Sequence, residues 1–153
     1  METETFIYIG LIRHKIKWCY FSETLVYSYL SEQEHHTVVF WNTKTKKQNF
    51  KYVKKMIDIV GKGSFCLISA KINEENFLLI LSNSIGSPVD NKIINIEPVF
   101  TAINSTHCVV SDRHYIYVWQ FRGNEPGVEN KSINLQGKEF SVNLLTKKMM
   151  KEV

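Results

Sequence analysis

The 153-residue chain is poor in cysteine and proline, and it has no long apolar run. Its three cysteines, Cys19, Cys66 and Cys108, are odd in number and lack Cys-x-x-Cys spacing, which argues against a disulfide framework or a zinc site. The longest apolar stretches, residues 6–12 and 77–81, are too short to cross a bilayer. The first five residues are polar and acidic, so we expect no secretory signal and a soluble, cytosolic chain with reduced cysteines.

Excess charge of one sign is also nearly absent. The 19 basic and 15 acidic residues leave a formal net charge of +4, and many of the lysines fall within residues 44–55 and 147–151. No aromatic residues alternate with these lysines as a base-stacking platform would require. We therefore expect solvated turns and strand edges, and no nucleic-acid partner.

A helical period is missing throughout, and short β-branched or aromatic runs alternate with turn residues. The runs predict strands at residues 17–21, 24–30, 37–41, 48–53, 56–60, 64–71, 77–81, 92–96, 98–103, 108–110 and 115–121, with a last strand in 132–135 or 140–145. Turns or loops are expected between them, notably at residues 31–36, 42–47, 61–63, 85–91 and 111–114.

One strand pattern recurs along the chain. The sequence Thr-Val-Val-Phe-Trp ends at Trp41, Phe-Leu-Leu-Ile-Leu ends at Leu81, and Tyr-Ile-Tyr-Val-Trp ends at Trp119. The three ends are 40 and 38 positions apart, close to the repeat of β-propeller blades, which are four-stranded sheets. We predict an all-β partial β-propeller of about three four-stranded antiparallel WD-repeat-like blades over residues 16–145. A leading strand at 6–15 precedes them, a charged tail at 146–153 follows, and the ring is not closed.

Candidate catalytic residues are few and badly placed. Asp112 precedes a strand and is expected to accept bonds from turn amides, and it is near His107 or His114. Cys108 is the nearest nucleophile, but successive residues of a strand point to opposite faces of the sheet, so Cys108 is expected to point away from His107. We therefore predict no catalytic residue.

Candidate ligand sites are equally weak. His35 and His36 lack the further ligands that a metal site needs. The pair Gly61 and Gly63 lacks the third glycine and the helix of a nucleotide-binding loop, and it predicts a hairpin turn. Trp41 and Trp119 are explained by packing within the blades. We predict no metal, no cofactor and no cofactor-binding residue.

Longer stretches of the chain resemble the WD repeat-containing protein 35 family, whose members are subunits of intraflagellar transport complex A. The resemblance covers residues 6–122 and ends with Trp119-Gln-Phe-Arg122, and the sequence is expected to diverge after Arg122. The segments that carry it include 6–13, 17–20, 38–44, 51–54 and 83–90. Family members carry two amino-terminal propellers followed by helical repeats. The resemblance therefore implies that residues 6–15 close the first propeller and that Trp18 begins the second.

The resemblance implies a non-enzymatic scaffold in retrograde ciliary transport, cilium assembly and delivery of membrane proteins to cilia. Its partners would be the other complex A subunits and, indirectly, the retrograde motor and membrane cargo. The expected location is the cilium, the ciliary base and the cytoplasm. Loops such as 31–36 and 85–91 are candidate contacts. A coat-like subunit of vesicle trafficking and an enzyme of unknown type are the alternatives.

Overall fold

The computed structural model describes residues 16–31, 35–122 and 138–141, and every regular element within them is a strand. In that part of the chain no helix has the length and apolar character needed to span a membrane. The strands are β1 (Trp18–Phe21), β2 (Thr24–Leu30), β3 (His35–Asn42), β4 (Gln48–Lys54), β5 (Met56–Lys62), β6 (Phe65–Lys71), β7 (Phe77–Ser82), β8 (Pro88–Ile94), β9 (Phe100–Ile103), β10 (His107–Ser111), β11 (Tyr115–Gln120) and β12 (Lys138–Ser141).

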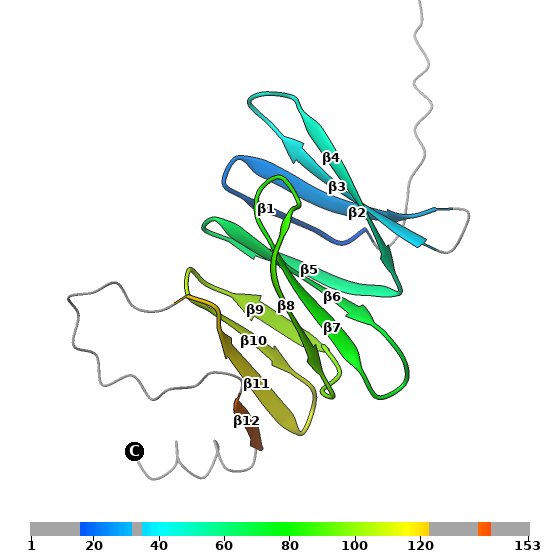
Figure 1. The fold of residues 1–153 in the computed structure, drawn as a ribbon, viewed down its shortest axis with the longest axis vertical. Coiled ribbons are helices and arrows are strands. Elements are labelled where there is room, and N and C mark those ends of the chain that lie inside the picture. The colour runs from blue at the N-terminus through cyan, green and yellow to red at the C-terminus, as the bar shows by residue number, and fades with distance from the viewer. Residues whose placement is uncertain (1–15, 32–34, 123–137, 142–153) are drawn as a thin grey trace, which may run out of the picture.

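The strands form three four-stranded antiparallel sheets, each following the order of the chain. We call β1–β4 the first sheet, β5–β8 the second and β9–β12 the third (Figure 1). The prediction of an all-β chain of four-stranded sheets in an unclosed ring is confirmed.

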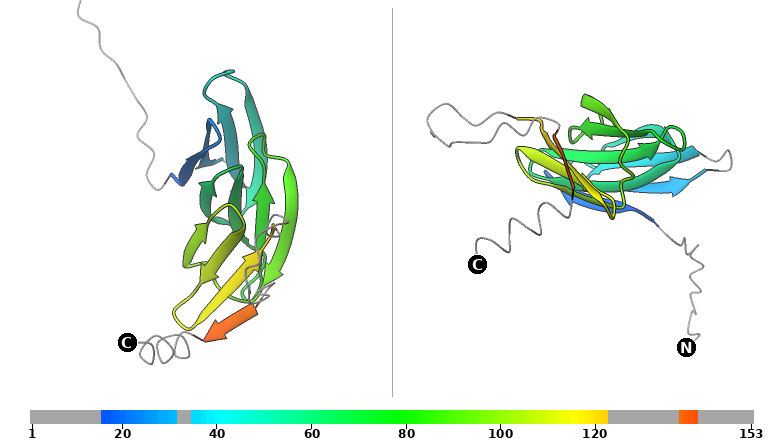
Figure 2. Two further views of the ribbon diagram at one scale, coloured as in Figure 1. Left: turned by 90° about the vertical axis from the view of Figure 1, so that its left-hand side faces the viewer. Right: turned by 90° about the horizontal axis from the view of Figure 1, so that it is seen from below.

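The sheets are joined along their first strands. β1 packs against β5, and β5 packs against β9, so the first strands lie together while the later strands spread outwards. In a side view the three sheets follow one another along a curved arc (Figure 2). This is the arrangement of successive blades around part of a propeller.

Two hydrophobic cores hold the sheets together. The first lies between the first and second sheets and includes Val26, Val38, Phe40, Cys66 and Ile68. Each of these side chains is at most 1% exposed. Burial of this kind contributes roughly 1.5–3 kcal/mol for each large apolar side chain, so the contact between the sheets stabilises the fold.

The second core lies between the second and third sheets. Leu67, Leu79 and Leu81 meet Cys108 and Trp119 there. Alternation along β6 explains how one sheet serves both cores, because Cys66 and Ile68 face the first sheet while Leu67 faces the third. The second sheet is therefore apolar on both faces.

Several predicted boundaries are wrong. The expected turn at 61–63 begins later, because Gly61 continues β5 and only Gly63 adopts a positive φ, of 64°. The expected loop at 85–91 ends earlier, since β8 begins at Pro88, where an outer strand tolerates proline. His35 and His36 belong to β3, although both were expected in a loop. β12 overlaps only the start of the second predicted alternative, 140–145.

Other expectations lie outside the described residues. These are the leading strand at 6–15, the loop residues 32–34 and the tail at 146–153.

Trp41, Leu81 and Trp119, the last residues of the recurring pattern, each lie in the third strand of a sheet. Their side chains do not all point to the same side of their sheets. Trp119 faces the second sheet, which precedes its own, and Leu81 faces the third sheet, which follows its own. Trp41 pairs with Leu25 on the face opposite to the first core, so it corresponds to Trp119 and not to Leu81. The alignment at Leu81 was wrong by one residue, and a one-residue shift reverses the face of a strand.

Candidate interaction surfaces

The cysteines are structural. Cys66 and Cys108 are fully buried and Cys19 is half-buried, and all three are free thiols. Burial raises the pKa of Cys108 to about 12, and burial together with the nearby Asp58 charge raises the pKa of Cys19 to about 12. Burial also raises the pKa of the Cys66 thiol. Since the thiolate is the reactive form, these cysteines are unsuited to nucleophilic chemistry.

The histidine, aspartate and cysteine near β10 do not form a catalytic group. Asp112 Oδ1 accepts the amides of His114 at 2.6 Å and of Tyr115 at 2.7 Å, which confirms its expected role in the turn. His107 Nδ1 lies 2.8 Å from the Thr106 hydroxyl oxygen. Cys108 points into the second core, so the expectation that it faces away from His107 is confirmed.

The paired histidines of β3 are not part of a metal-binding cluster. Among the described residues, no group of three or more histidine, cysteine, aspartate or glutamate side chains is arranged to hold a metal ion. His36 Nδ1 is buried without a hydrogen-bond partner, and burial lowers the pKa of this imidazole. Because burial disfavours the charged form, the His36 imidazole at the edge of the first core is neutral.

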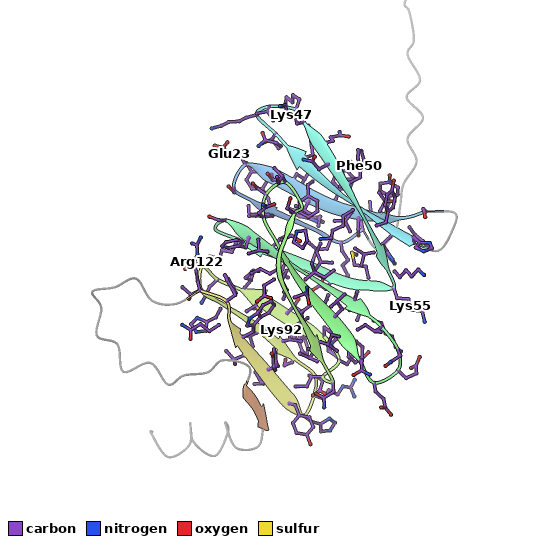
Figure 3. All side chains as sticks on the ribbon, viewed as in Figure 1. Glu23, Lys47, Phe50, Lys55, Lys92 and Arg122 are labelled. Carbon is purple, nitrogen blue, oxygen red and sulfur yellow. The ribbon has the colours of Figure 1, made fainter. Side chains whose placement is uncertain are left out.

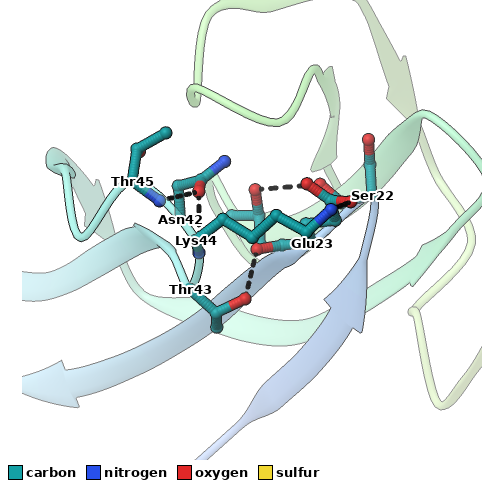
Figure 4. Close-up of polar contacts among 7 residues, drawn as sticks. Ser22, Glu23, Asn42, Thr43, Lys44 and Thr45 are labelled. Atoms are coloured by element: carbon teal, nitrogen blue, oxygen red, sulfur yellow. Dashed lines mark hydrogen bonds and ion pairs between the residues drawn. The ribbon is translucent and has the colours of Figure 1, made fainter.

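A polar corner joins two turns of the first sheet (Figure 4). The Thr43 amide and hydroxyl both donate to the Glu23 carbonyl oxygen at 2.9 Å, and the Lys44 ammonium pairs with the Glu23 carboxylate. Asn42 Oδ1 accepts the amides of Lys44 at 3.0 Å and Thr45 at 2.8 Å. These contacts fix the shape of an exposed surface formed by turns, but they are not arranged for catalysis.

The described lysines of residues 44–55 lie at several separate places on the first sheet. Lys47 and Lys55 lie at opposite ends of β4 (Figure 3). Lys46 Nζ lies 5.4 Å from the centre of the Trp41 ring, and Lys51 Nζ turns inward to Ser82 Oγ at 3.3 Å. Desolvation lowers the pKa of Lys51. The expected role of these lysines as turn and strand residues fits this placement.

An apolar surface lies on the first sheet, on the face turned away from the second sheet. We call it the leading face. Residues directly opposite on paired strands share a face, so the registers define its members. Its aromatic and aliphatic members are Trp18, Tyr20, Leu25, Tyr27, Tyr29, Val39, Trp41, Phe50 and Tyr52.

Four aromatic residues dominate the leading face. Trp18 is 63% exposed, Tyr20 54%, Phe50 54% and Tyr52 73%. The sequence signal for this face is the recurrence of aromatic residues at every second position, at 18/20, 27/29 and 50/52. Aromatic residues are enriched at protein–protein interfaces, so the leading face is a candidate contact surface.

A second apolar surface lies on the third sheet, on the face turned away from the second sheet. We call it the trailing face. It contains Phe100, which is 66% exposed, and Val109, Ile116 and Val118, which are half-buried. Among the described residues, the outward faces of the first and third sheets are therefore both apolar and uncovered by another sheet.

Three stacked, four-stranded antiparallel sheets define a segment of a β-propeller. Two solved structures share this fold. Hsv2 from Kluyveromyces marxianus matches with a TM-score of 0.51 at 9% identity, over 82% of this chain and 37% of that chain. Hsv2 from Kluyveromyces lactis matches with a TM-score of 0.50 at 10% identity, over 82% and 36%.

A family model described as the WDR35 second beta-propeller matches residues 18–148. WD repeat-containing protein 35 of Rattus norvegicus is 40% identical over 125 residues, which cover 80% of this chain and 11% of the relative. The Homo sapiens protein is 38% identical over 136 residues, covering 80% and 12%. The chain belongs to the WD repeat-containing protein 35 family, in its second-propeller region.

The family match corrects one expectation. We expected divergence after Arg122, yet the match continues to residue 148. It begins at Trp18, where β1 begins. The chain spans about an eighth of the length of the curated relatives it matches.

Proposed function

We propose that this chain is a non-enzymatic protein–protein interaction module of intraflagellar transport complex A. Its role is retrograde transport along the axoneme, cilium assembly and delivery of membrane proteins to the cilium. The other complex A subunits are its direct partners, and the retrograde motor and membrane cargo are indirect ones. It acts at the cilium, the ciliary base and in the cytoplasm.

Family membership carries this proposal, because 37–40% identity to three mammalian relatives is spread over 80% of the chain. The surfaces support it. Two apolar sheet faces and a rigid polar corner are suited to contact with proteins. The buried thiols and the separated His107 and Cys108 offer no nucleophile with an adjacent base.

Affinity capture in ciliated cells tests the proposal. The tagged 153-residue chain is expressed, and its partners are identified by quantitative mass spectrometry. We expect enrichment of named complex A subunits and localisation to the ciliary base. Recovery of vesicle-coat subunits in their place would favour the coat-like alternative and contradict the proposal.

A variant with a damaged core provides the control. Trp119→Ala removes a buried side chain that joins the second and third sheets. Capture that depends on the folded blades is lost in this variant, whereas capture by a flexible or charged segment persists. Persistence at the wild-type level would contradict recognition through the propeller surface.

A further inference from the structure

The loop between β7 and β8, residues 83–87, reaches across to the first sheet (Figure 1). A Cβ atom at Gly86, where φ is 83°, would lie 2.8 Å from Phe40 Cδ2, so glycine is needed for the backbone to rest on this ring. The Lys51 ammonium on β4 donates to the Gly86 carbonyl oxygen at 3.4 Å and to Ser82 Oγ at 3.3 Å. The loop is therefore held against β3 by a ring contact and against β4 by a lysine.

Hydrogen bonds inside the loop fix its shape as well. Asn83 Oδ1 accepts the amide of Ile85 at 3.1 Å and that of Ser87 at 3.0 Å. The Asn83 carbonyl oxygen accepts the Gly86 amide at 3.0 Å. An asparagine side chain in this role replaces a backbone acceptor of the turn. A loop that is ordered before a partner arrives loses little conformational entropy on binding.

Ile85 is the large apolar residue that this loop presents to solvent, and it is 58% exposed. A single exposed isoleucine on a mobile segment would mean little, because such residues are common on protein surfaces. Here the amide of the same residue is bound and both neighbouring contacts of the loop are made to the first sheet. An aliphatic side chain held in one place is suited to anchor a partner.

The side chains of the first sheet beside this loop are basic. Residues 47, 49, 51 and 53 share one face of the sheet by alternation, and Val53 in the first core shows that this face is directed at the second sheet. Lys47 is exposed in that row, and its carbonyl oxygen accepts the Asn42 amide at 2.9 Å, which continues the pairing of β3 with β4. In the described turns 22–23 and 43–47, the one carboxylate is that of Glu23, which already pairs with Lys44.

The carboxylates of the second sheet do not offset this charge. Asp90 on β8 is opposite Leu81, which belongs to the second core, so Asp90 lies on the face directed at the third sheet. Asp58 on β5 already binds an ammonium and a hydroxyl group. Among the described residues, the surroundings of Ile85 therefore have positive charge. Charge complementarity favours a negatively charged partner.

We propose that the 83–87 loop and Lys47 bind an acidic segment of another protein, in which an apolar side chain packs on Ile85. Lys51 and Asn83 are positioning residues that hold the loop for this contact. A protein segment fits better than an anionic membrane, which recruits clusters of basic residues, because residues 47–53 place a single exposed lysine on this face of β4. The site does not involve the outward faces of the first and third sheets, and it does not depend on the transport role.

Selection of random peptides displayed on phage against the 153-residue chain tests the proposal. We expect the enriched peptides to be rich in aspartate and glutamate, with an aliphatic or aromatic residue among them. Vesicles of phosphatidylserine and phosphatidylcholine form a second arm, in which we expect no binding. A lack of enrichment, enrichment of basic or uncharged peptides, or binding of the vesicles in place of acidic peptides would each overturn the proposal.

Matched substitutions locate the contact on the chain. Ile85→Asp is expected to raise the dissociation constant of the enriched peptides at least about tenfold, and Lys47→Glu roughly threefold with a weaker dependence on salt. Ile72→Asp and Lys55→Glu are the controls, because Ile72 is 46% exposed and Lys55 is exposed at the opposite end of β4 from Lys47 (Figure 3). Peptide binding that survives Ile85→Asp, or that falls equally in Ile72→Asp, would overturn the site.

Asn83→Ala separates the order of the loop from direct contact. We expect faster amide hydrogen exchange at Ile85 and Ser87, and a dissociation constant raised roughly threefold, because the partner must then order the loop. Asn73→Ala is the control, since Asn73 Oδ1 accepts two amides in the same way in the turn between β6 and β7. Faster exchange in Asn83→Ala with unchanged peptide binding would overturn the positioning role of Asn83.

Discussion

The Thr101 hydroxyl on β9 donates a hydrogen bond to Asp58 Oδ2 on β5 at 2.6 Å. The other carboxylate oxygen of Asp58 lies 3.3 Å from the ammonium of Lys17, which immediately precedes β1. One carboxylate thus connects the inner parts of all three sheets. The Asp58 side chain is 24% exposed, so water weakens its hydrogen bond and ion pair less than it weakens those of a fully exposed pair.

Asp58→Ala is expected to destabilise the chain by about 1–3 kcal/mol, since it removes a hydrogen bond to a charged group and leaves the Thr101 hydroxyl without its acceptor. Urea unfolding followed by circular dichroism at fixed protein concentration measures the change. Glu74→Ala is the control, because Glu74 pairs with Lys71 at an exposed site, where an ion pair contributes little to stability. Equal losses in the two variants would contradict the connecting role of Asp58.

The sequence predicted the sheets but not this connection. Strand runs and the spacing of about forty residues are local signals, and they located every described strand to within a few positions. Asp58 and Thr101 are 43 residues apart, and their meeting depends on how β5 packs on β9. The bulge between Met56 and Asp58 also turns Asp58 in a direction that simple alternation does not predict.

Gly61 is required by a close approach between sheets. A Cβ atom at this position would lie 2.7 Å from Phe21 Cδ1 and 2.8 Å from Cys19 Sγ. Gly61→Ala is therefore expected to cost about 1–3 kcal/mol through overpacking, measured as a lower urea midpoint. Gly63→Asn is the control, because a Cβ atom at Gly63 would come no closer than 4.0 Å to Ser105 Cα and asparagine tolerates its positive φ. A Gly61→Ala midpoint at or above the control would contradict the close packing.

Trp119 is expected to contribute strongly to stability. It is 3% exposed, and its ring meets Phe121 edge-on with centroids 6.3 Å apart. Trp119→Ala is expected to cost about 3–5 kcal/mol, as for other buried aromatic residues. Thermal unfolding measures it, with Tyr115→Ala on the same strand as an exposed control expected to change little. A similar loss in both variants would show that strand composition, not burial, determines stability here.

The two open faces could not be recognised by composition alone. An aromatic residue on a strand looks the same in the sequence whether the next sheet is present or absent. The alternation of Trp18 with Tyr20, and of Phe50 with Tyr52, predicts one apolar face, but only the number and order of sheets shows that it is uncovered. Trp41 and Trp119 make this explicit, because equivalent positions differ in burial.

The buried Cys108 thiol predicts a loss of stability at alkaline pH. Burial raises its pKa from 9.0 to about 12, so the folded chain keeps this proton while the unfolded chain releases it above about pH 9. The unfolded state then binds fewer protons, and the free energy of unfolding falls as pH rises between about 9 and 12. The slope is at most about 1.4 kcal/mol per pH unit for one group.

Cys108→Ala removes this contribution while other groups titrate as before. We expect the variant to be less stable than the wild type at pH 7, because it leaves a small cavity between the second and third sheets. The difference between the two chains is expected to shrink as pH rises above about 9. Urea unfolding at successive pH values measures both curves, and parallel curves would mean that the Cys108 thiol ionises as readily in the folded chain as in the unfolded one.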